Sequence, residues 1–243
     1  MTGTDRKRQR RFALITFDLD DTLWQLHPVL ERAESQLEQW MHQHCPEVPR
    51  RFDREALARL RLEVHRERPE LRHDVSALRL EAMRRALRDS GHDEAQALRL
   101  AHEAFAVFLH WRHVVEPFGP VDAVLSTLAR DRTLVALTNG NADVFRLAIG
   151  RYFRFAFTAA GLGSSKPAPA HFEAALRAAG ATPRHALHVG DHSEHDVYGA
   201  RSAGMTAVWF NPARAPWDGS GEAPAQLHDL AELPSLIETL ERS

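Results

Sequence analysis

The sequence contains little cysteine, since Cys45 is the only one in 243 residues. A single cysteine excludes an intrachain disulfide and a metal site built from several thiolates, and it favours a reducing compartment, the cytoplasm. Cys45 stands before Pro46 at the end of a predicted helix, where we expect an unreactive thiol rather than a nucleophile. Lysine is also scarce, and arginine supplies most of the positive charge.

Long apolar runs and a strong net charge are absent as well. No stretch approaches the roughly 18 apolar residues of a membrane-spanning helix, so no membrane partner is expected. The net charge of −2 gives no general attraction to nucleic acid. The basic arm at residues 1–11, MTGTDRKRQRR, precedes an apolar run that is too short for a signal peptide and ends in aspartate. We therefore expect the arm to be a disordered lead-in.

The remaining composition is that of a globular protein, with 44% hydrophobic and 26% charged residues. Residues 12–17, FALITF, are short, continuous and apolar, as expected for a strand buried on both faces of a parallel sheet. After Pro117, predicted helices and strands alternate. This alternation predicts an α/β fold with a doubly wound, Rossmann-like parallel sheet. The later predicted strands span residues 133–138, 154–158, 185–191 and 206–210.

Residues 28–114 have a different pattern. They are rich in Leu, Ala, Arg and Glu, with apolar residues at helical spacing. The pattern predicts about four helices and no strand. Three of these helices begin after an aspartate that can cap the first turn, namely Asp53, Asp74 and Asp93.

The predicted helical segment interrupts the α/β part of the chain directly after its first strand. We therefore expect two domains: an α/β core made of residues 1–23 and 115–243, and a helical-bundle cap domain made of residues 24–114. A cap inserted at this point is expected to close over the carboxyl ends of the strands and to exclude water.

Polar and charged residues follow the predicted strands at their carboxyl ends. Because parallel strands bring those ends to one edge of a sheet, where ligands bind, we expect these residues to converge. Carboxylates from two strands can share a hard cation such as Mg²⁺. Hydroxyl, backbone N–H and ammonium groups can hold a phosphate. The set comprises Asp18, Asp20, Asp21 and Thr22 after the first strand, Thr138, Asn139 and Gly140 after the second, Lys166 ahead of a helix, and Asp191 and Asp196 after a later strand.

Each of these residues also has an ordinary structural interpretation. Asp20 and Asp21 fit a solvated turn, Thr138 fits a strand-end hydroxyl bonded to its own backbone, and Lys166 fits a surface lysine. Asp191 fits a helix cap. All of these interpretations must hold together, in the right strand order, to explain the whole set. We therefore interpret it as one phosphate and metal site.

Four motifs in this order resemble those of the haloacid dehalogenase superfamily: DLDDT, LTNG, SKP and GDHSEHD. The helical insertion after the first motif is similar to the type-one cap of that superfamily. Dehalogenases of the superfamily lack the second aspartate of the first motif, whereas Asp20 is present here. The resemblance therefore implies the phosphatase branch, which hydrolyses phosphoric monoesters with Mg²⁺ as cofactor.

The resemblance implies roles for the acidic residues. Asp18 would be the nucleophile that forms an aspartyl-phosphate, and Asp20 the general acid and then the general base. Mg²⁺ would be held by Asp18, Asp191 and the backbone carbonyl of Asp20.

The resemblance also implies roles for the residues around the phosphoryl group. Thr138, Asn139 and Lys166 would hold its oxygens as charge shifts in the transition state. Asp196 and Thr22 would orient these groups without contacting the substrate themselves. Asp196 in particular is expected to orient either Lys166 or a metal-bound water.

The segments HDVSALR, LTNGNAD, FLHWR and FDLDDTLW resemble bacterial phosphatases that act on flavin mononucleotide and on the ribityl-aminouracil phosphate of riboflavin synthesis. This resemblance implies a small phosphorylated metabolite as the substrate. A planar ring needs a flat apolar surface, and Trp24 is the residue we expect to provide it. His73 and Arg79 are the candidates for contacts with polar edges of the ligand.

The fourth motif departs from the family pattern at His192 and His195, where Ser, Asp or Asn are more usual. We expect both to be solvent-facing loop residues rather than metal ligands. Several alternative functions remain open at this point: a phosphomutase, a sugar or nucleotide phosphatase of the same superfamily, a phosphate-accepting receiver-like signalling protein, and a non-catalytic binding protein with the same fold.

Overall fold

The computed structural model describes residues 11–219 and 221–242, so the basic arm expected to be disordered lies almost entirely outside the described residues. Its centre is a sheet of six parallel strands in the order β3-β2-β1-β4-β5-β6. The strands span β1 Leu14–Phe17, β2 Thr133–Thr138, β3 Phe155–Thr158, β4 Ala186–Gly190, β5 Thr206–Phe210 and β6 Ala225–Leu227.

The central strand β1 is buried on both faces. Leu14 packs into an apolar cluster on one face of the sheet, and Ile15 and Phe17 pack into the cluster on the other. A strand in this position must be apolar at every residue rather than at alternate ones, which is why FALITF reads as a continuous apolar run. Phe17 is in register with Ala136 of β2 and Val189 of β4, so these three strands end side by side.

Helices cover both faces of the sheet. On one face, α6 (Val121–Leu128) and α10 (Leu233–Arg242) contribute to the cluster that contains Ile15 and Phe17. On the other face, α8 (Ala170–Ala179) and α9 (Gly199–Ser202) contribute to the cluster that contains Leu14. This arrangement confirms the predicted doubly wound α/β fold.

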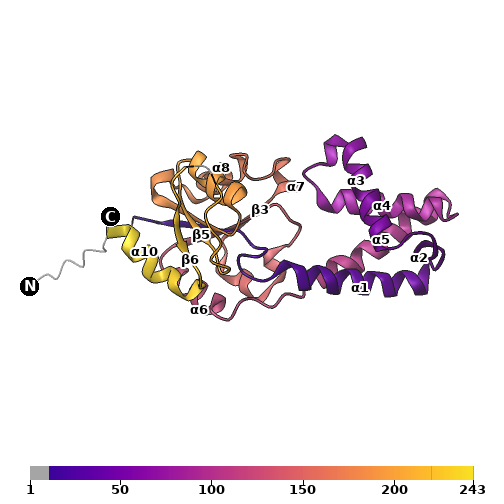
Figure 1. The fold of residues 1–243 in the computed structure, drawn as a ribbon, viewed down its shortest axis with the longest axis horizontal. Coiled ribbons are helices and arrows are strands. Elements are labelled where there is room, and N and C mark those ends of the chain that lie inside the picture. Colours follow the sequence, from indigo (N-terminus) through magenta and orange to yellow (C-terminus); the bar gives the residue numbers. More distant parts are fainter. Residues whose placement is uncertain (1–10, 220, 243) are drawn as a thin grey trace, which may run out of the picture.

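A group of five α-helices, the helical block, lies between β1 and β2 in the chain and to one side of the sheet in space (Figure 1). Its core contains Leu37, Leu87 and Phe108 and forms a cluster separate from the two that line the sheet. The first and last helices of the block pack against each other. The helices span α1 Leu26–His44, α2 Glu47–Arg51, α3 Arg54–Glu67, α4 Val75–Asp89 and α5 Glu94–Arg112.

Local sequence signals account for most of the helical block. The side chains of Asp53, Asp74 and Asp93 accept hydrogen bonds from backbone N–H groups of the first turns of α3, α4 and α5, as predicted. The block has one helix more than the four expected, because α2 forms a short turn between α1 and α3. Cys45 is buried at the end of α1, and burial, followed by the nearby Glu47, raises the pKa of its thiol to about 12. The thiol therefore stays protonated.

Shorter elements connect the sheet, and some of them differ from expectation. The helix expected from about Asp143 is replaced by two 3₁₀ turns, because Leu147 between them has an extended backbone, with φ −103° and ψ 154°. Strand β6 was not expected from the sequence. The connecting elements span η1 Pro69–Leu71, η2 Val144–Arg146, η3 Ala148–Tyr152, α7 Ala159–Leu162, η4 Pro183–His185, the π-helical turn η5 Ser193–Tyr198 and η6 Leu230–Glu232.

None of the helices within residues 11–219 and 221–242 combines the length and the apolar character that crossing a membrane requires.

Candidate active site

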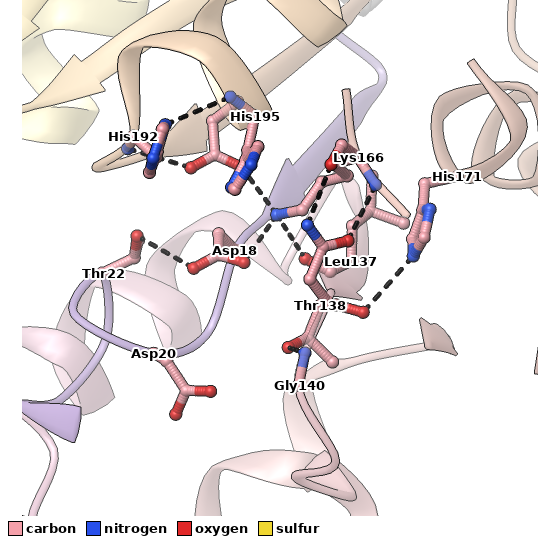
Figure 2. Close-up of polar contacts among 12 residues, drawn as sticks. Asp18, Asp20, Thr22, Leu137, Thr138, Gly140, Lys166, His171, His192 and His195 are labelled. Atoms are coloured by element: carbon pink, nitrogen blue, oxygen red, sulfur yellow. Dashed lines mark hydrogen bonds and ion pairs between the residues drawn. The ribbon is translucent and has the colours of Figure 1, made fainter. Parts of the chain in front are cut away.

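The predicted site residues meet at one edge of the sheet. Asp18 follows β1, Thr138 ends β2 and Asp191 follows β4, and these three strands are neighbours in the sheet. Lys166 reaches the same place from the loop between α7 and α8. Figure 2 shows its ammonium group between Asp18 and the loop that follows β4. Side chains far apart in the sequence are thus brought together by the parallel order of the strands.

Lys166 is the buried cation of this site, with 3% of its surface exposed. Its Nζ donates to Asp18 Oδ1 at 2.5 Å, to Asp196 Oδ1 at 2.6 Å and to the Leu137 carbonyl at 2.9 Å. These three acceptors use all three N–H donors of the ammonium group. The side chain of Asn139 holds the Lys166 backbone at both ends, accepting from its N–H at 2.7 Å and donating to its carbonyl at 3.0 Å.

Asn139 therefore has a different contact from the expected one. The sequence predicted that Asn139 holds a phosphoryl oxygen, whereas in the structure both polar atoms of its side chain are bonded to Lys166. The Thr138 hydroxyl accepts a hydrogen bond from Gly140 N at 2.9 Å, which leaves its own proton for another acceptor. A Cβ at Gly140 would lie 2.8 Å from Asp20 Oδ2, so a side chain at this position would displace the Asp20 carboxylate.

Three carboxylates form a compact acidic cluster. Asp18, Asp191 and Asp196 each place one oxygen within 4.8 Å of the others. Asp196 is already occupied, because Oδ1 accepts from Lys166 and from His188 and Oδ2 accepts from the His192 backbone. Asp18 and Asp191 are the two that remain for a cation. Hard oxygen donors of this kind suit Mg²⁺.

The electrostatics of the acidic cluster fit a divalent cation. Burial, with further contributions from Asp196 and Asp191, raises the pKa of Asp18 well above its usual value although Lys166 acts in the opposite direction. Burial and the charge of Asp196 raise the pKa of Asp191 to about 6, against the hydrogen bond of 3.1 Å that the Thr22 hydroxyl donates to it. The chain thus places less positive charge here than the acids need, and a divalent cation would supply it.

Asp196 differs from the other two acids of the cluster. Burial would raise its pKa, but Lys166 and His188 outweigh that effect and hold the pKa well below its usual value. Burial alone would lower the pKa of Lys166, but the carboxylates of Asp18 and Asp196 outweigh this effect and raise it. Asp196 and Lys166 therefore form a charged pair inside the protein, in which Asp196 orients the lysine.

His188 is a residue of this network that was not predicted from the sequence. It lies in β4, is fully buried, and its Nε2 lies 3.1 Å from Asp196 Oδ1 while its Nδ1 lies 2.7 Å from the Thr16 hydroxyl. Burial lowers the pKa of His188, so the ring is neutral. Because a carboxylate only accepts, we assign the ring proton to Nε2. A histidine inside an apolar strand that is covered on both faces is the sequence signal for such a partner.

Asp20 points away from Lys166 (Figure 2). Its carboxylate accepts from Nη2 of Arg112 at 2.6 and 2.7 Å and from Nε1 of Trp24 at 3.0 Å. Trp24 is completely buried in the core under the sheet edge, with 0% of its surface exposed. This corrects the expectation that Trp24 stacks on a ligand, because its ring has no open face. The indole instead supports Asp20.

The other two candidate specificity residues belong to the helical block. Arg79 forms an ion pair of 2.8 Å with Glu34 and lies over the ring of Phe108, so it packs within the block. His73 does reach the sheet side, because its Nδ1 lies 2.8 Å from the Ser165 hydroxyl next to Lys166. The structure thus brings His73 to the seam between block and sheet, and the contacts of Arg79 described above are with residues of the block.

Two cavities border the site. A cavity of about 170 Å³ lies at the seam between the helical block and the sheet, and polar side chains are among the residues around it. A larger one of about 560 Å³ extends from Asp191 along the ends of β5 and β6. The residues around the seam cavity are His73, Asp74, Val75, Ser76, Gly140, Asn141, Thr158 and Ala160.

The two histidines of the fourth motif stack on each other, with ring centroids 4.0 Å apart. His192 is exposed and caps the η5 turn by accepting from the backbone N–H groups of Glu194 and His195. Burial lowers the pKa of the half-buried His195. Within the described residues, neither ring belongs to the acidic cluster.

Comparisons with known proteins agree with this geometry. The model of the haloacid dehalogenase-like hydrolase family matches residues 12–204. The 5-amino-6-(5-phospho-D-ribitylamino)uracil phosphatase YigB of Escherichia coli (strain K12) is 35% identical over 93% of this chain and 97% of its own length. The phosphoserine phosphatase of Thermus thermophilus is 34% identical over 61% of this chain and 62% of its own. A crystal structure described as a 2-haloacid dehalogenase from Pseudomonas syringae pv. Tomato DC3000 has a TM-score of 0.90 and 43% identity, covering 94% of this chain and 99% of that one.

Proposed function

Because the chain belongs to the haloacid dehalogenase-like hydrolases and is a phosphomonoester hydrolase of that family, we propose that it acts through an aspartyl-phosphate on Asp18 with Mg²⁺ as cofactor. One observation carries this proposal: the buried contact of 2.5 Å between the Lys166 ammonium and Asp18, with Asp191 and Asp196 in the same cluster. Family membership excludes the receiver-like alternative. The single buried cysteine is consistent with the cytoplasm as the site of action.

In the proposed first step, Asp18 attacks the phosphorus atom. One of its oxygens is bonded to Lys166, and the other, which has only a longer contact of 3.5 Å with the Thr22 hydroxyl, makes the attack. The bond from phosphorus to the leaving oxygen breaks, and that oxygen takes a proton from Asp20. Lys166 and the Thr138 hydroxyl hold the phosphoryl oxygens during this step, and the Asn139 side chain keeps the Lys166 backbone in place.

In the proposed second step, water attacks the phosphorus atom of the aspartyl-phosphate. Asp20, now a carboxylate, takes a proton from this water, and the Asp18 carboxylate is released together with inorganic phosphate. Mg²⁺ bound by Asp18, Asp191 and the backbone carbonyl of Asp20 would screen the repulsion between the anionic nucleophile and the anionic substrate. Thr22 and Asp196 orient Asp191 and Lys166 for these steps.

We propose the helical block as a cap, so that the chain divides into a core of residues 1–23 and 115–243 and a cap of residues 24–114. Contacts at the seam support this division. Besides the His73–Ser165 contact, Asn141 donates to the Ser76 hydroxyl at 3.2 Å, which joins α4 to the loop after β2. The block therefore lies at the same edge of the sheet as Asp18, where opening and closing can admit and exclude water.

We propose a phosphate ester of a ribityl or similar polyol chain as the substrate, with flavin mononucleotide or a riboflavin precursor as the leading candidates. The likeness to YigB, over nearly the full length of both proteins, supports this choice. The seam cavity supports it as well, because Ser76, Asn141 and Thr158 offer hydroxyl and amide groups to a hydroxylated chain. Its volume of about 170 Å³ suits the polyol chain of such an ester, with the ring outside this cavity.

Phosphate release from a panel of esters tests this function. We expect the highest kcat/KM for flavin mononucleotide and ribitol 5-phosphate, compared with glucose 6-phosphate and a nucleoside monophosphate. Chelation of metal by EDTA is expected to lower every rate by at least about 10²-fold, and added Mg²⁺ should restore it, because a bound cation stabilises the transition state by several kcal/mol.

Three outcomes contradict parts of the proposal. Equal kcat/KM values across the panel would remove the ribityl assignment and leave only a general phosphatase. Conversion of a sugar phosphate to its isomer without release of phosphate would indicate a phosphomutase. Release of chloride from 2-chloropropionate, with no phosphate from any ester, would favour the dehalogenase activity for which the Pseudomonas syringae structure is named.

A further inference from the structure

Arg112 is a buried arginine outside the four motifs. It is the last residue of α5, where the chain leaves the helical block, and only 2% of its surface is exposed. Removing a guanidinium from water costs several kcal/mol, and an ion pair with a carboxylate often does no more than offset that cost. A hydrophobic residue of similar volume would serve packing equally well. We therefore look for a role of the Arg112 guanidinium other than stabilising the fold.

The contacts of Arg112 are directed at Asp20. Its Nη2 donates to both oxygens of Asp20, at 2.7 and 2.6 Å, and its Nε donates to Asn141 Oδ1 at 3.2 Å. Nη1 is buried and has no hydrogen-bond partner among the described residues. A buried N–H without a partner is unfavourable, so this geometry does not serve the hydrogen-bonding needs of the arginine. It serves the orientation of the carboxylate.

Two further residues lie against the Asp20 carboxylate, Trp24 and Gly140. Trp24 donates to Oδ1 at 3.0 Å from the other direction. Gly140 lies so close that a Cβ there would be 2.8 Å from Asp20 Oδ2 and 3.4 Å from Arg112 Nη2. Arg112, Trp24 and Gly140 thus surround the carboxylate. Of these three residues, only Arg112 belongs to a helix of the helical block, as the last residue of α5.

We propose that Arg112 is a positioning residue that holds the Asp20 carboxyl group for proton transfer to the leaving oxygen and connects this group to the helical block. The inference rests on the proposed function, because it uses Asp20 as the general acid. When the bond between phosphorus and the leaving oxygen breaks, its electron pair stays on that oxygen, which takes the Asp20 proton and leaves as an alcohol. Asp20 is then a carboxylate, which can accept from the Arg112 guanidinium at the Nη2 contact of 2.6 Å.

The dependence of the rate on the leaving group tests this role. An alkyl phosphate needs a proton on its leaving oxygen, whereas p-nitrophenyl phosphate has a leaving group that departs without one. For Arg112→Met we expect kcat/KM to fall about 10²-fold for the best alkyl phosphate, because misplacement of a catalytic group costs about this much. We expect little change for p-nitrophenyl phosphate. Arg112→Lys keeps one cationic donor and should recover part of the loss.

Two controls separate positioning from a structural effect. Arg132→Met removes another largely buried arginine, which pairs with Glu241 at the opposite end of β2, and should leave both kcat/KM values unchanged. In an Asp20→Asn background, Arg112→Met should no longer alter the ratio of the two kcat/KM values, because the group that it positions is already gone.

Several results would overturn the proposal. Equal losses for the two substrates in Arg112→Met and Arg112→Lys, with both variants folded by circular dichroism, would show a structural role only. If Arg112→Met does not fold, the test uses Arg112→Lys instead, again by comparing the loss of kcat/KM for the alkyl phosphate with the loss for p-nitrophenyl phosphate. If the wild-type enzyme hydrolyses p-nitrophenyl phosphate and the Arg112 variants lose kcat/KM equally for both substrates, only this inference is overturned and the proposed function stands. A wild-type enzyme that hydrolyses no phosphate ester overturns the proposed function and this inference with it.

Discussion

Asp18→Asn is expected to lower kcat on the order of 10⁵-fold, because an amide is not a nucleophile toward phosphorus and no neighbouring group can replace it. The variant should remain folded, since the amide oxygen can still accept from the Lys166 ammonium, which now lies 2.5 Å from Asp18 Oδ1. Steady-state phosphate release and a urea unfolding curve measure the two effects.

Asp89→Asn is the matched control for this substitution. Asp89 is exposed at the end of α4, and the same chemical change there should leave kcat as in the wild type. An Asp18→Asn enzyme that is folded and retains substantial turnover would contradict the assignment of the nucleophile.

Lys166→Met is expected to affect activity and stability together. Loss of the ammonium removes a contact to the phosphoryl group and should lower kcat about 10²–10³-fold. It also leaves the buried carboxylates of Asp18 and Asp196 without their common partner. Breaking a buried pair in this way costs about 3–5 kcal/mol in the free energy of unfolding. Urea unfolding at pH 7 measures this loss.

The stability loss of Lys166→Met should depend on pH. In the wild type, Lys166 holds the pKa of Asp196 low, so this carboxylate stabilises the fold above the unfolded pKa of about 3.9. Without the ammonium, burial raises the pKa values of both acids above that value. The folded variant then binds more protons than the unfolded chain, so the deficit should be largest at pH 7 and shrink toward pH 4.

Arg151→Met serves as the control for Lys166→Met. Arg151 pairs with Asp122 on the surface, and the loss of such a pair changes the free energy of unfolding by less than about 1 kcal/mol, with no effect on kcat. A Lys166→Met variant as stable as the wild type, or with a deficit that does not change with pH, would contradict the buried charge pair.

The parts of the fold that were predictable have strong local signals. The strand at Leu14–Phe17 is a continuous apolar run, and the helices α3, α4 and α5 start at capping aspartates. The strand β6 has only three residues and no such run, so its pairing with β5 depends on the surrounding structure. The helix expected from about Asp143 did not form, because Leu147 takes an extended backbone conformation that the local residue pattern does not specify.

The candidate site was predictable where a residue follows a strand. Asp18, Thr138 and Asp191 could be placed together from strand order alone. Arg112 and His188 could not, because their roles depend on contacts that the local pattern does not specify. Arg112 meets Asp20 across 92 positions of sequence, and His188 meets Asp196 from inside a strand that otherwise reads as apolar core.

Trp24 shows the limit of reading a large aromatic residue from its position in the sequence. It follows the first motif closely, which made a ligand contact plausible, yet the chain turns there and the indole packs beneath the sheet edge. Its N–H still needs an acceptor when buried, and Asp20 provides one at 3.0 Å. Whether such a residue faces a ligand or the core depends on the path of the backbone.

The aspartyl-phosphate on Asp18 is tested most directly by trapping it during turnover. The enzyme is mixed with substrate and Mg²⁺, quenched in acid and reduced with borohydride, which converts an acyl phosphate to an alcohol, and its peptides are then analysed by mass spectrometry. We predict homoserine at position 18 in the sample with substrate and none in the samples without substrate or with Asp18→Asn. Modification at another residue, or rapid turnover with no modified residue at all, would contradict the proposed mechanism.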